Sequence, residues 1–590
     1  MKKISIYALS LALGAMALTS CEDAFGGFLD KQPSNELTKD EVLGDWALLV
    51  QFHNDTYNFL RHGALRINNS WLDAATDLAE TSTGTAGTRT TFNIGNYYGS
   101  GGANELTGTW ESCYRGIRKC NITINTLEAD TAGTLRPSDL SVELYKTRKQ
   151  NYLSEARFLR AWFYWELFLR YGPVPIVTEV LDPDGDLLSD YTTRPSLKEY
   201  VDFILKELKE CEPGLKTYEE STDATYAGVV NQPAARAIYG RIMLYMASPR
   251  YAAESGITWQ QAAEAQKSFI DDFGSNYRLE LRTNGGVAAY NNAWLLTTYS
   301  DQNPEVIFFR NDANINWGNI FADTPVGEGG GGGLCPSQNL VDMYDMIDGS
   351  APFTSYDATG APVYNSDNMP TVNRVSGYTD QNMWKNRDPR LAATVLHNGS
   401  EWGGRIINVV YGMADNPIGN QNSTPTGYYV RKYIPEAILS AEHTGSAKRL
   451  WKIIGYNEVL LNYAEALCEA DFDTNYGKIC DLLDQIRHRG GIIGNVADRM
   501  DLTNQTAMRN FIHKERTIEL CFEEHRWWDV RRWKVAKEAL GRNIYGVNVA
   551  PDGTITRKIA QQRVWQDRFY LYPIPEGEEW KSNIENNPGW

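Results

Sequence analysis

The sequence predicts a mainly α-helical protein: an α–α superhelix of tetratricopeptide-like helix pairs with a large loop-rich insertion and minor β structure. Apolar residues recur at spacings of three and four within residues 45–274 and 451–590, as on one face of a helix. Several of these runs end at Gly-Pro, Pro-Gly or Pro, which do not continue a helix. Residues 275–450 are instead rich in Gly, Asn, Thr, Asp, Pro and Trp.

The helices are predicted in order from these patterns. Leu153, Ala156, Leu159, Phe163 and Leu167 mark the first clear helix, which Gly172-Pro173 stops. Further helices are expected at residues 201–208, 233–248 and 259–273, and after the insertion at 459–467, 475–489 and 505–533. No clean 34-residue period is present, so the tetratricopeptide-like assignment rests on helix pairing alone.

The insertion, residues 275–450, contains turn dipeptides such as Asn284-Gly285 and a run of five glycines at 329–333. Short β runs are expected at 306–309 and 428–431. Long irregular segments inside a compact protein are usually functional. We therefore expect one helical scaffold, residues 45–274 and 451–590, whose insertion carries much of the function.

The first 20 residues read as an export signal. Lys2 and Lys3 precede an apolar run, and small residues stand directly before Cys21, which resembles a bacterial lipobox. We expect cleavage before Cys21, lipid attachment to its thiol, and a tether over residues 21–44 that leads into a single domain, 21–590. Acyl chains would anchor the protein to a membrane without spanning it. The Glu22-Asp23 pair resembles a surface-export tag.

Composition excludes several classes of protein. Lys plus Arg number 57 against 74 for Asp plus Glu, a formal charge of −17 without a basic block, which argues against a nucleic-acid partner. Seven cysteines follow Cys21 without CxxC or zinc spacing, so no disulfide framework and no metal are predicted. Acidic, amide-rich loops could hold structural calcium, but no EF-hand loop is present and no cofactor is predicted.

Enzyme motifs are also absent from the sequence. It contains no HExxH, no GxSxG and no P-loop. The acidic pairs Asp271-Asp272 and Glu523-Glu524 are adjacent residues, which point in different directions on a helix. We interpret them as solvated or salt-bridged carboxylates, and we expect no catalysis.

Several sequence blocks stand in a recognisable order along the chain. They are WESCYRGI at 110–117, EARFLRAWFYWEL at 155–167, RYGPVPIV at 170–177, DPRL at 388–391, GYYVRK at 427–432, EVLLNYAEA at 458–466, RTIEL at 516–520, EEHRWWDVRRW at 523–533, LYPIP at 571–575 and NPGW at 587–590. Together these blocks resemble the SusD-like (SusD/RagB) family of outer-membrane nutrient-binding lipoproteins. The resemblance covers essentially the whole mature chain, although His525 stands where the family often has Gly.

The resemblance implies a surface lipoprotein of the outer membrane that captures oligosaccharide without catalysis. It would act as the lid of a SusC-like TonB-dependent transporter and deliver the ligand to it. Some members bind peptides or other nutrients, which stays open as an alternative. Two other hypotheses stay open. A secreted glycan-active enzyme would release new reducing ends from a glycan. A helical scaffold for protein interaction only would have its loop aromatics buried.

Candidate ligand residues are aromatic side chains in loops with amide or charged neighbours. Aromatic rings cover the C–H faces of sugars, while a few polar groups bond the hydroxyl edges. For each aromatic residue, core or loop anchoring is the alternative, and Trp384 and Trp402 are weaker candidates. The residues chosen are Asn316, Trp317 and Asn319; Trp294 and Tyr299; and Arg89, Asn96, Tyr97 and Tyr98.

Two other groups are predicted to be structural. Trp71, followed by Asp73 and Asp77 on an expected helix, is interpreted as structural. The 516–533 segment repeats charges three or four residues apart, which predicts a buried ion network along one helix face above Trp527 and Trp533. The charged members are Arg516, Glu519, Glu523, Arg526 and Asp529.

Overall fold

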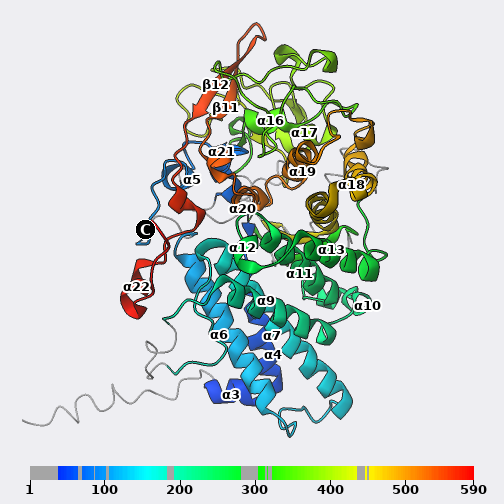
Figure 1. Cartoon of the computed structure of the whole chain (residues 1–590). Helices are drawn as coiled ribbons and strands as arrows, with labels where there is room; N and C mark the ends of the chain where they lie inside the picture. Colours follow the sequence, from blue (N-terminus) through cyan, green and yellow to red (C-terminus); the bar gives the residue numbers. More distant parts are fainter. Residues whose placement is uncertain are drawn as a thin grey trace, which may run out of the picture.

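The computed structural model describes residues 38–63, 70–85, 87–100, 105–182, 192–280, 303–311, 315–316, 322–434, 446–447 and 451–590, without the side chains of 315–316 and 446–447. Most of the helices form one scaffold (Figure 1). Its members are α3 (Lys39–Gly44), α4 (Trp46–Asn54), α6 (Gly108–Ala129), α7 (Val142–Tyr171), α9 (Leu197–Cys211), α11 (Gln232–Ala247), α13 (Trp259–Phe273), α18 (Tyr456–Gly490) and α19 (Gln505–Glu519). Because α3 begins at Lys39, the predicted tether over residues 21–44 extends too far: Thr38 and Glu41 form a capping box that starts this helix.

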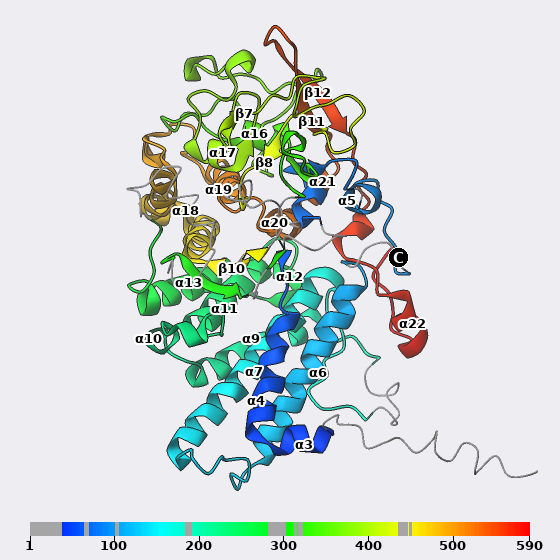
Figure 2. The ribbon, with the colours of Figure 1, turned by 180° about the vertical axis from the view of Figure 1, so that it is seen from behind.

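The long helices contact one another in a continuous series. The series runs from α6 to α7, α9, α11, α13, α18 and α19, so helices from both sides of the insertion meet where α13 packs on α18. Figure 1 and Figure 2 show this stack extending from the lower end of the molecule into its upper half. The prediction of a mainly α-helical fold is confirmed.

Local sequence sets most helix ends. The Ser141 hydroxyl accepts from Leu144 N and starts α7, and Gly172, with φ 72°, ends it. Capping boxes at Ser196–Glu199 and Thr258–Gln261 start α9 and α13. The end of α7 at Gly172 and the bounds of α13 agree with the predictions, whereas α7 and α9 begin earlier than the predicted apolar patterns, at Val142 and Leu197.

The predicted helix over 505–533 is wrong as a single helix. It is divided into α19 and α20 (His525–Arg532), and Phe522 and Glu524 between them have φ near 62° and 65°. Residues other than glycine rarely adopt positive φ. Glu524 is held there by its backbone N–H, which donates to the buried Asp73 carboxylate at 3.0 Å. A tertiary contact therefore sets this break.

The insertion begins and ends on one pair of strands. β2 (Val306–Arg310) pairs antiparallel with β10 (Trp451–Gly455). Between them lie mostly loops, and the other short pairs are β3 (Ile315–Asn316) with β9 (Ser446–Ala447), β5 (Val395–Leu396) with β8 (Tyr429–Val430), and β6 (Glu401–Trp402) with β7 (Arg405–Ile406). A further pair, β1 (Ala79–Thr81) with β4 (Leu334–Pro336), joins the insertion to the N-terminal part of the chain.

The C-terminal part of the chain contributes to the insertion end of the molecule. The hairpin β11 (Ile544–Val549) and β12 (Ile555–Gln561) lies beside α16 (Gln338–Met343), and α17 (Pro389–Thr394) lies on the far side of α16 (Figure 2). Asn339 fixes it there, because its side chain bonds Tyr545 N and Asn543 O. The prediction placed all of 451–590 in the helical scaffold. The hairpin within this range lies with the insertion instead. The remaining short helices are α5 (Gly87–Thr91), α10 (Tyr218–Ser221), α12 (Ala252–Ser255), α21 (Ala536–Leu540) and α22 (Glu576–Ser582).

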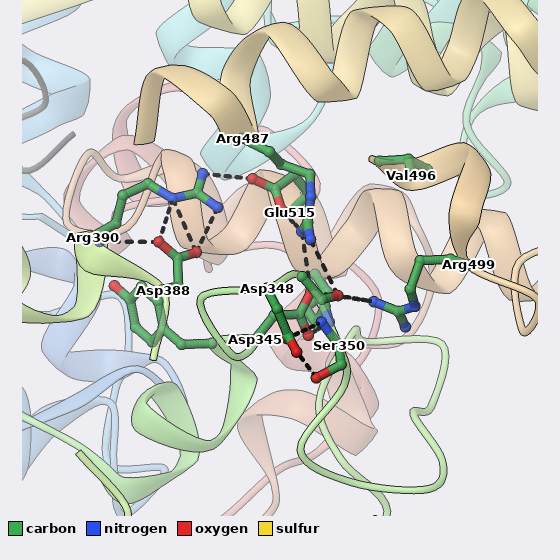
Figure 3. Close-up of polar contacts among 12 residues, drawn as sticks. Asp345, Asp348, Ser350, Asp388, Arg390, Arg487, Val496, Arg499 and Glu515 are labelled. Carbon is green, nitrogen blue, oxygen red and sulfur yellow. Dashed lines mark hydrogen bonds and ion pairs between the residues drawn. The ribbon is translucent and has the colours of Figure 1, made fainter. Parts of the chain in front are cut away.

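Buried ion pairs join the scaffold to the insertion. Figure 3 shows Arg487 of α18 between Asp345 and Glu515, at 3.0 Å from each, and Arg390 paired with Asp388 at 2.7 Å. All five side chains are buried. The pairs that cross between scaffold and insertion are Arg487 with Asp345, and Arg390 with Glu519 of α19 at 3.1 Å. Because a lone buried charge is costly, these two pairs fix the position of the insertion on the scaffold.

The predicted ion network around residues 516–533 is confirmed as buried, but its pairing is not along one helix face. Only Arg516 and Asp529, 2.7 Å apart, pair within the predicted row. The other three members reach distant elements: Glu519 bonds Arg489 and Arg390, Glu523 bonds Lys432 and Lys452, and Arg526 bonds Asp77.

Candidate ligand-binding site

The structure describes part of the predicted ligand set. Arg89, Asn96, Tyr97 and Tyr98 lie in described segments, and the Asn316 backbone pairs with Ser446 in the β3–β9 pair. The other predicted residues lie outside the described residues, namely Trp294, Tyr299, Trp317, Asn319 and the lipidation residue Cys21.

Tyr97 is not available to a ligand in this structure, which corrects its prediction as a binding residue. It is 3% exposed, and its ring lies 4.2 Å from Phe569, 5.0 Å from Phe92 and 5.4 Å from Trp590, measured between ring centroids. Burial of its ring by the closing segment of the chain removes it from the surface. Its neighbour Tyr98 is 48% exposed, and Asn96 is exposed as well.

Arg89 supports a loop as well as facing solvent. Its Nε lies 3.3 Å from Oε1 of Glu80, a fully buried carboxylate that also accepts from Asn93 and Arg563. The Arg89 side chain stays partly exposed. Arg89 therefore anchors its loop, the alternative that the sequence left open. Its exposed part can still reach a ligand.

The segment that carries Trp317 is attached at both ends to one aromatic cluster. Before it, Arg310 pairs with Trp451 in the β2–β10 ladder. After it, Asp323 accepts a hydrogen bond from the Trp71 indole at 2.9 Å, and the Trp71 and Trp451 rings lie 6.2 Å apart. Trp71 is 1% exposed, which confirms its structural interpretation. Trp402 is likewise buried, and Trp384 stacks on His397 at 4.4 Å.

The glycine run at 329–333 brings three loops together. A Cβ on Gly332, whose φ is 61°, would lie 2.1 Å from the Asn422 carbonyl oxygen, and one on Gly331 would lie 2.5 Å from the Ala322 oxygen. Ser82 donates from its backbone N–H to Gly333 O and from its hydroxyl to Gly331 O. Glycine is thus required for the close approach of these loops.

A hollow of about 190 Å³ lies where α10, α11 and the end of α13 face β2. We call it the tyrosine hollow. Its two sides are joined by the Asn311 amide, which donates to Ala227 O at 2.9 Å, and by Arg278 N, which donates to Pro304 O. The predicted residues Trp294 and Tyr299 belong to the segment between Glu280 and Asn303, whose two ends flank this hollow. Among its lining residues are Tyr218, Tyr226, Asn276, Tyr277, Arg278 and Phe309.

The lining of the tyrosine hollow suits a neutral, hydroxyl-rich ligand. Tyr226 is 37% exposed, and its ring carries the Lys216 ammonium at 4.6 Å from the centroid. Tyr218 meets Tyr277 edge to face at 5.3 Å. No carboxylate occurs among the described lining residues, so the polar groups are amides, hydroxyls and one guanidinium. Rings with a few placed polar groups are typical of small-ligand sites.

Sequence reasoning missed Tyr226 and Tyr218. Tyr226 follows Ser221-Thr-Asp-Ala-Thr and precedes Ala-Gly228, so it is an aromatic residue in a polar, glycine-containing loop. The criterion that selected Trp317 would have selected it too. Tyr411, 68% exposed beside Gly412, meets the same sequence criterion but does not line the hollow.

The two acidic pairs are ion-paired. Asp271 bonds Lys267, Asp272 bonds Arg236 at 2.6 Å, and Glu524 bonds Arg61 at 2.7 Å, while Glu523 meets Lys432 at 2.8 Å. This agrees with the salt-bridge interpretation. Within the described ranges, no group of three or more His, Cys, Asp or Glu side chains is arranged to hold a metal ion.

His525, the departure from the family pattern, is enclosed beside three charged groups. Its Nε2 lies 3.5 Å from Glu458, and its Nδ1 lies 3.4 Å from Arg516. Burial, with Arg516 and Arg241 nearby, lowers the pKa of His525 well below its ordinary value. The imidazole is therefore neutral at physiological pH and belongs to the buried network.

Comparison with known proteins assigns the family. A model described as "SusD family" matches residues 297–590, and one described as "Starch-binding associating with outer membrane" matches residues 27–244. The chain belongs to the SusD family. Its SusD-family relatives include SusD-like protein P38 of Formosa agariphila, 23% identical over 444 residues that cover 73% of each chain. SusD-like protein P2 of the same organism is 28% identical over 167 residues, which are 28% of this chain and 30% of P2.

Solved SusD-like structures share this fold. A SusD-like protein of Bacteroides fragilis superposes with a TM-score of 0.74 at 24% identity, covering 95% of this chain and all of that one. A protein of the same species named as a SusD-like carbohydrate-binding protein gives 0.69 at 22% identity, covering 91% and 98%. In the part of this SusD-family chain that the structure describes, no helix combines the length and apolar character needed to cross a bilayer.

Proposed function

We propose that this SusD-family protein captures oligosaccharides at the cell surface and delivers them, as a lid, to a SusC-like TonB-dependent transporter, without catalysis. In this proposal residues 1–20 are removed and Cys21 carries the lipid that anchors the chain to the outer membrane. Family membership and the outer-membrane description of one matching family model support it.

The observation that carries glycan binding is the tyrosine hollow. Its rings offer apolar faces, Asn276 and Arg278 offer hydrogen-bond donors, and its described lining holds no carboxylate that would attack a glycosidic bond. Glycosidases need two carboxylates about 5–9.5 Å apart across the sugar. The hollow therefore has the groups for binding and, in its described lining, lacks those for hydrolysis.

Isothermal titration of the mature chain against a panel of oligosaccharides and peptides tests the ligand class. We expect saturable oligosaccharide binding that Tyr226→Ala and Trp317→Ala each weaken about tenfold, a loss of roughly 1.4 kcal/mol. Tyr411→Ala, an equal change at an exposed tyrosine outside the hollow, should leave affinity unchanged. If only peptides bind, the ligand class is peptide and not oligosaccharide. If nothing binds, the proposal is refuted.

Two further measurements test the remaining parts of the proposal. Affinity purification from detergent-solubilised membranes should recover an outer-membrane barrel protein with the wild-type chain. Cys21→Ala should release the chain from the membrane fraction. Incubation with the bound oligosaccharide should release no new reducing ends, and any such release would favour an enzyme.

A further inference from the structure

A second cavity, of about 300 Å³, lies against α19. We call it the α19 pocket. Its sides are the insertion loop at 354–356, the loop at 499–504, and the first turns of α19 as far as Lys514. It shares no described lining residue with the tyrosine hollow.

The charged groups of the α19 pocket are already paired. Arg499 bonds both oxygens of Asp501 at 2.7 Å, and its third nitrogen donates to Gly349 O at 2.8 Å. Lys514, 1% exposed, bonds Asp345 and lies between the rings of Tyr356 and Phe511, at 4.5 and 4.9 Å from their centroids. Figure 3 shows Arg499 directed at Asp345, which Arg487 also bonds. An incoming anion would have to compete with these carboxylates.

The groups left for a ligand are neutral. The Tyr356 hydroxyl is buried and has no hydrogen-bond partner among the described residues. A buried polar atom without a protein partner is one that water or a ligand satisfies. Ser355, Asn504 and Thr506 also line the pocket, and no side-chain hydrogen bond engages the two hydroxyls or the amide nitrogen of Asn504 in the described part of the chain.

Apolar side chains complete the lining. Leu502, Ala507 and Phe511 line the pocket beside these polar groups. Hydroxyls and amides can both donate and accept, as sugar hydroxyls do, and the apolar side chains can meet C–H groups. The volume is at the lower limit of small-ligand sites, about 300–1,000 Å³.

We infer that the α19 pocket is a second ligand site that takes a single neutral sugar residue. The inference rests on the proposed function for the class of ligand, but its location is independent of the tyrosine hollow. A saccharide bound in the hollow and another in this pocket would give one chain two points of attachment to a glycan, which raises avidity.

Saturation-transfer NMR tests this with D-glucose, D-galactose and D-glucuronate as probes at millimolar concentration. The parent protein is the mature chain carrying Tyr226→Ala, so that signal from the tyrosine hollow is suppressed. Ala507→Phe fills the pocket without removing a side-chain hydrogen bond, and Tyr356→Phe removes only the unpartnered hydroxyl. Ala129→Phe, at an exposed position on α6, which contributes no residue to the pocket lining, is the matched control.

We expect glucose or galactose signal in the parent, reduced at least threefold by Ala507→Phe and also lowered by Tyr356→Phe, with no change in Ala129→Phe. Signal that Ala507→Phe and Tyr356→Phe leave intact overturns the inference, as does stronger binding of glucuronate. Oligosaccharide binding to wild type with no hexose signal in the Tyr226→Ala parent refutes this pocket and leaves the proposed function standing. Absence of all saccharide binding refutes both.

Discussion

Asp73 is a carboxyl group buried beside other acids. It is fully buried, and its Oδ2 accepts the Glu524 N–H while its Oδ1 has no hydrogen-bond partner among the described residues. Burial, with Glu524 nearby, raises the pKa of Asp73 from 3.8 to about 7. The folded state therefore holds this proton more tightly than the unfolded chain does.

Substituting Asp73 should change how stability depends on pH. Because the folded pKa lies above the unfolded one, the contribution of Asp73 to stability falls as pH rises from about 4 to 7 and stays low above that. We expect Asp73→Asn to raise the free energy of unfolding at pH 8, relative to wild type, more than at pH 5. Urea unfolding at both pH values measures this; a difference between the two proteins that does not vary with pH would contradict it.

Gly332 is a second residue whose role depends on its surroundings. It has positive φ, and a Cβ there would meet the Asn422 carbonyl oxygen at 2.1 Å. We expect Gly332→Ala to lower the melting temperature, because φ and the contact both oppose a side chain. Gly577→Ala, where a Cβ meets nothing within 4 Å in α22, is the control and should leave stability unchanged or slightly higher. Equal effects of the two changes would contradict this account.

The α18–α20 contact depends on a buried ion pair. Arg532 of α20 bonds both oxygens of Glu465 in α18 at 2.6 and 2.7 Å. Arg532 lowers the pKa of Glu465 to about 2, against the opposing effect of burial. The carboxylate stays charged, so it needs this partner.

Removing Arg532 should leave a buried charge without its main partner. We expect Arg532→Met to cost about 3–5 kcal/mol in the free energy of unfolding, measured by urea denaturation at pH 7. Arg115→Met breaks an exposed pair with Glu111 and should cost less than about 1 kcal/mol. A small loss at Arg532 would mean that other groups compensate Glu465.

The local rules predicted helices better than breaks. The ends of α7, α9 and α13 follow from Gly172 and from capping residues, which act within one turn. The break between α19 and α20 could not be predicted, because Glu524 takes a left-handed conformation through a contact with Asp73 more than four hundred residues away. The partners of the charged residues in 516–533 could not be predicted either, because the fold brings them from distant parts of the chain.

The cysteines report on the integrity of the fold. All seven described cysteines are buried, and burial raises the thiol pKa of Cys335 to about 12. In a recombinant protein that lacks residues 1–21, we expect none of the seven thiols to react with Ellman's reagent within minutes in the native state, and all seven to react in guanidinium. Rapid reaction of a native thiol would place that cysteine at the surface.

The sequence predicted which kinds of residue would form the candidate site, but not which individual residues. The rule that pairs loop aromatics with amides selected Tyr98, and it could have selected Tyr226. It also selected Tyr97, which Phe569 and Trp590 bury from the far end of the chain. Exposure depends on which distant segment covers a ring, and loop composition does not encode that.

The sequence by itself determined that this SusD-family chain is mainly helical, where its long helices end, and that its late charged segment is structural, because periodicity and capping act over a few residues. Only the tertiary structure decided the pairing of β2 with β10, the place of the β11–β12 hairpin beside the insertion, and the positions of the tyrosine hollow and the α19 pocket. Those depend on contacts between residues far apart in the chain, whose specificity comes from packing and from pairing of buried charges.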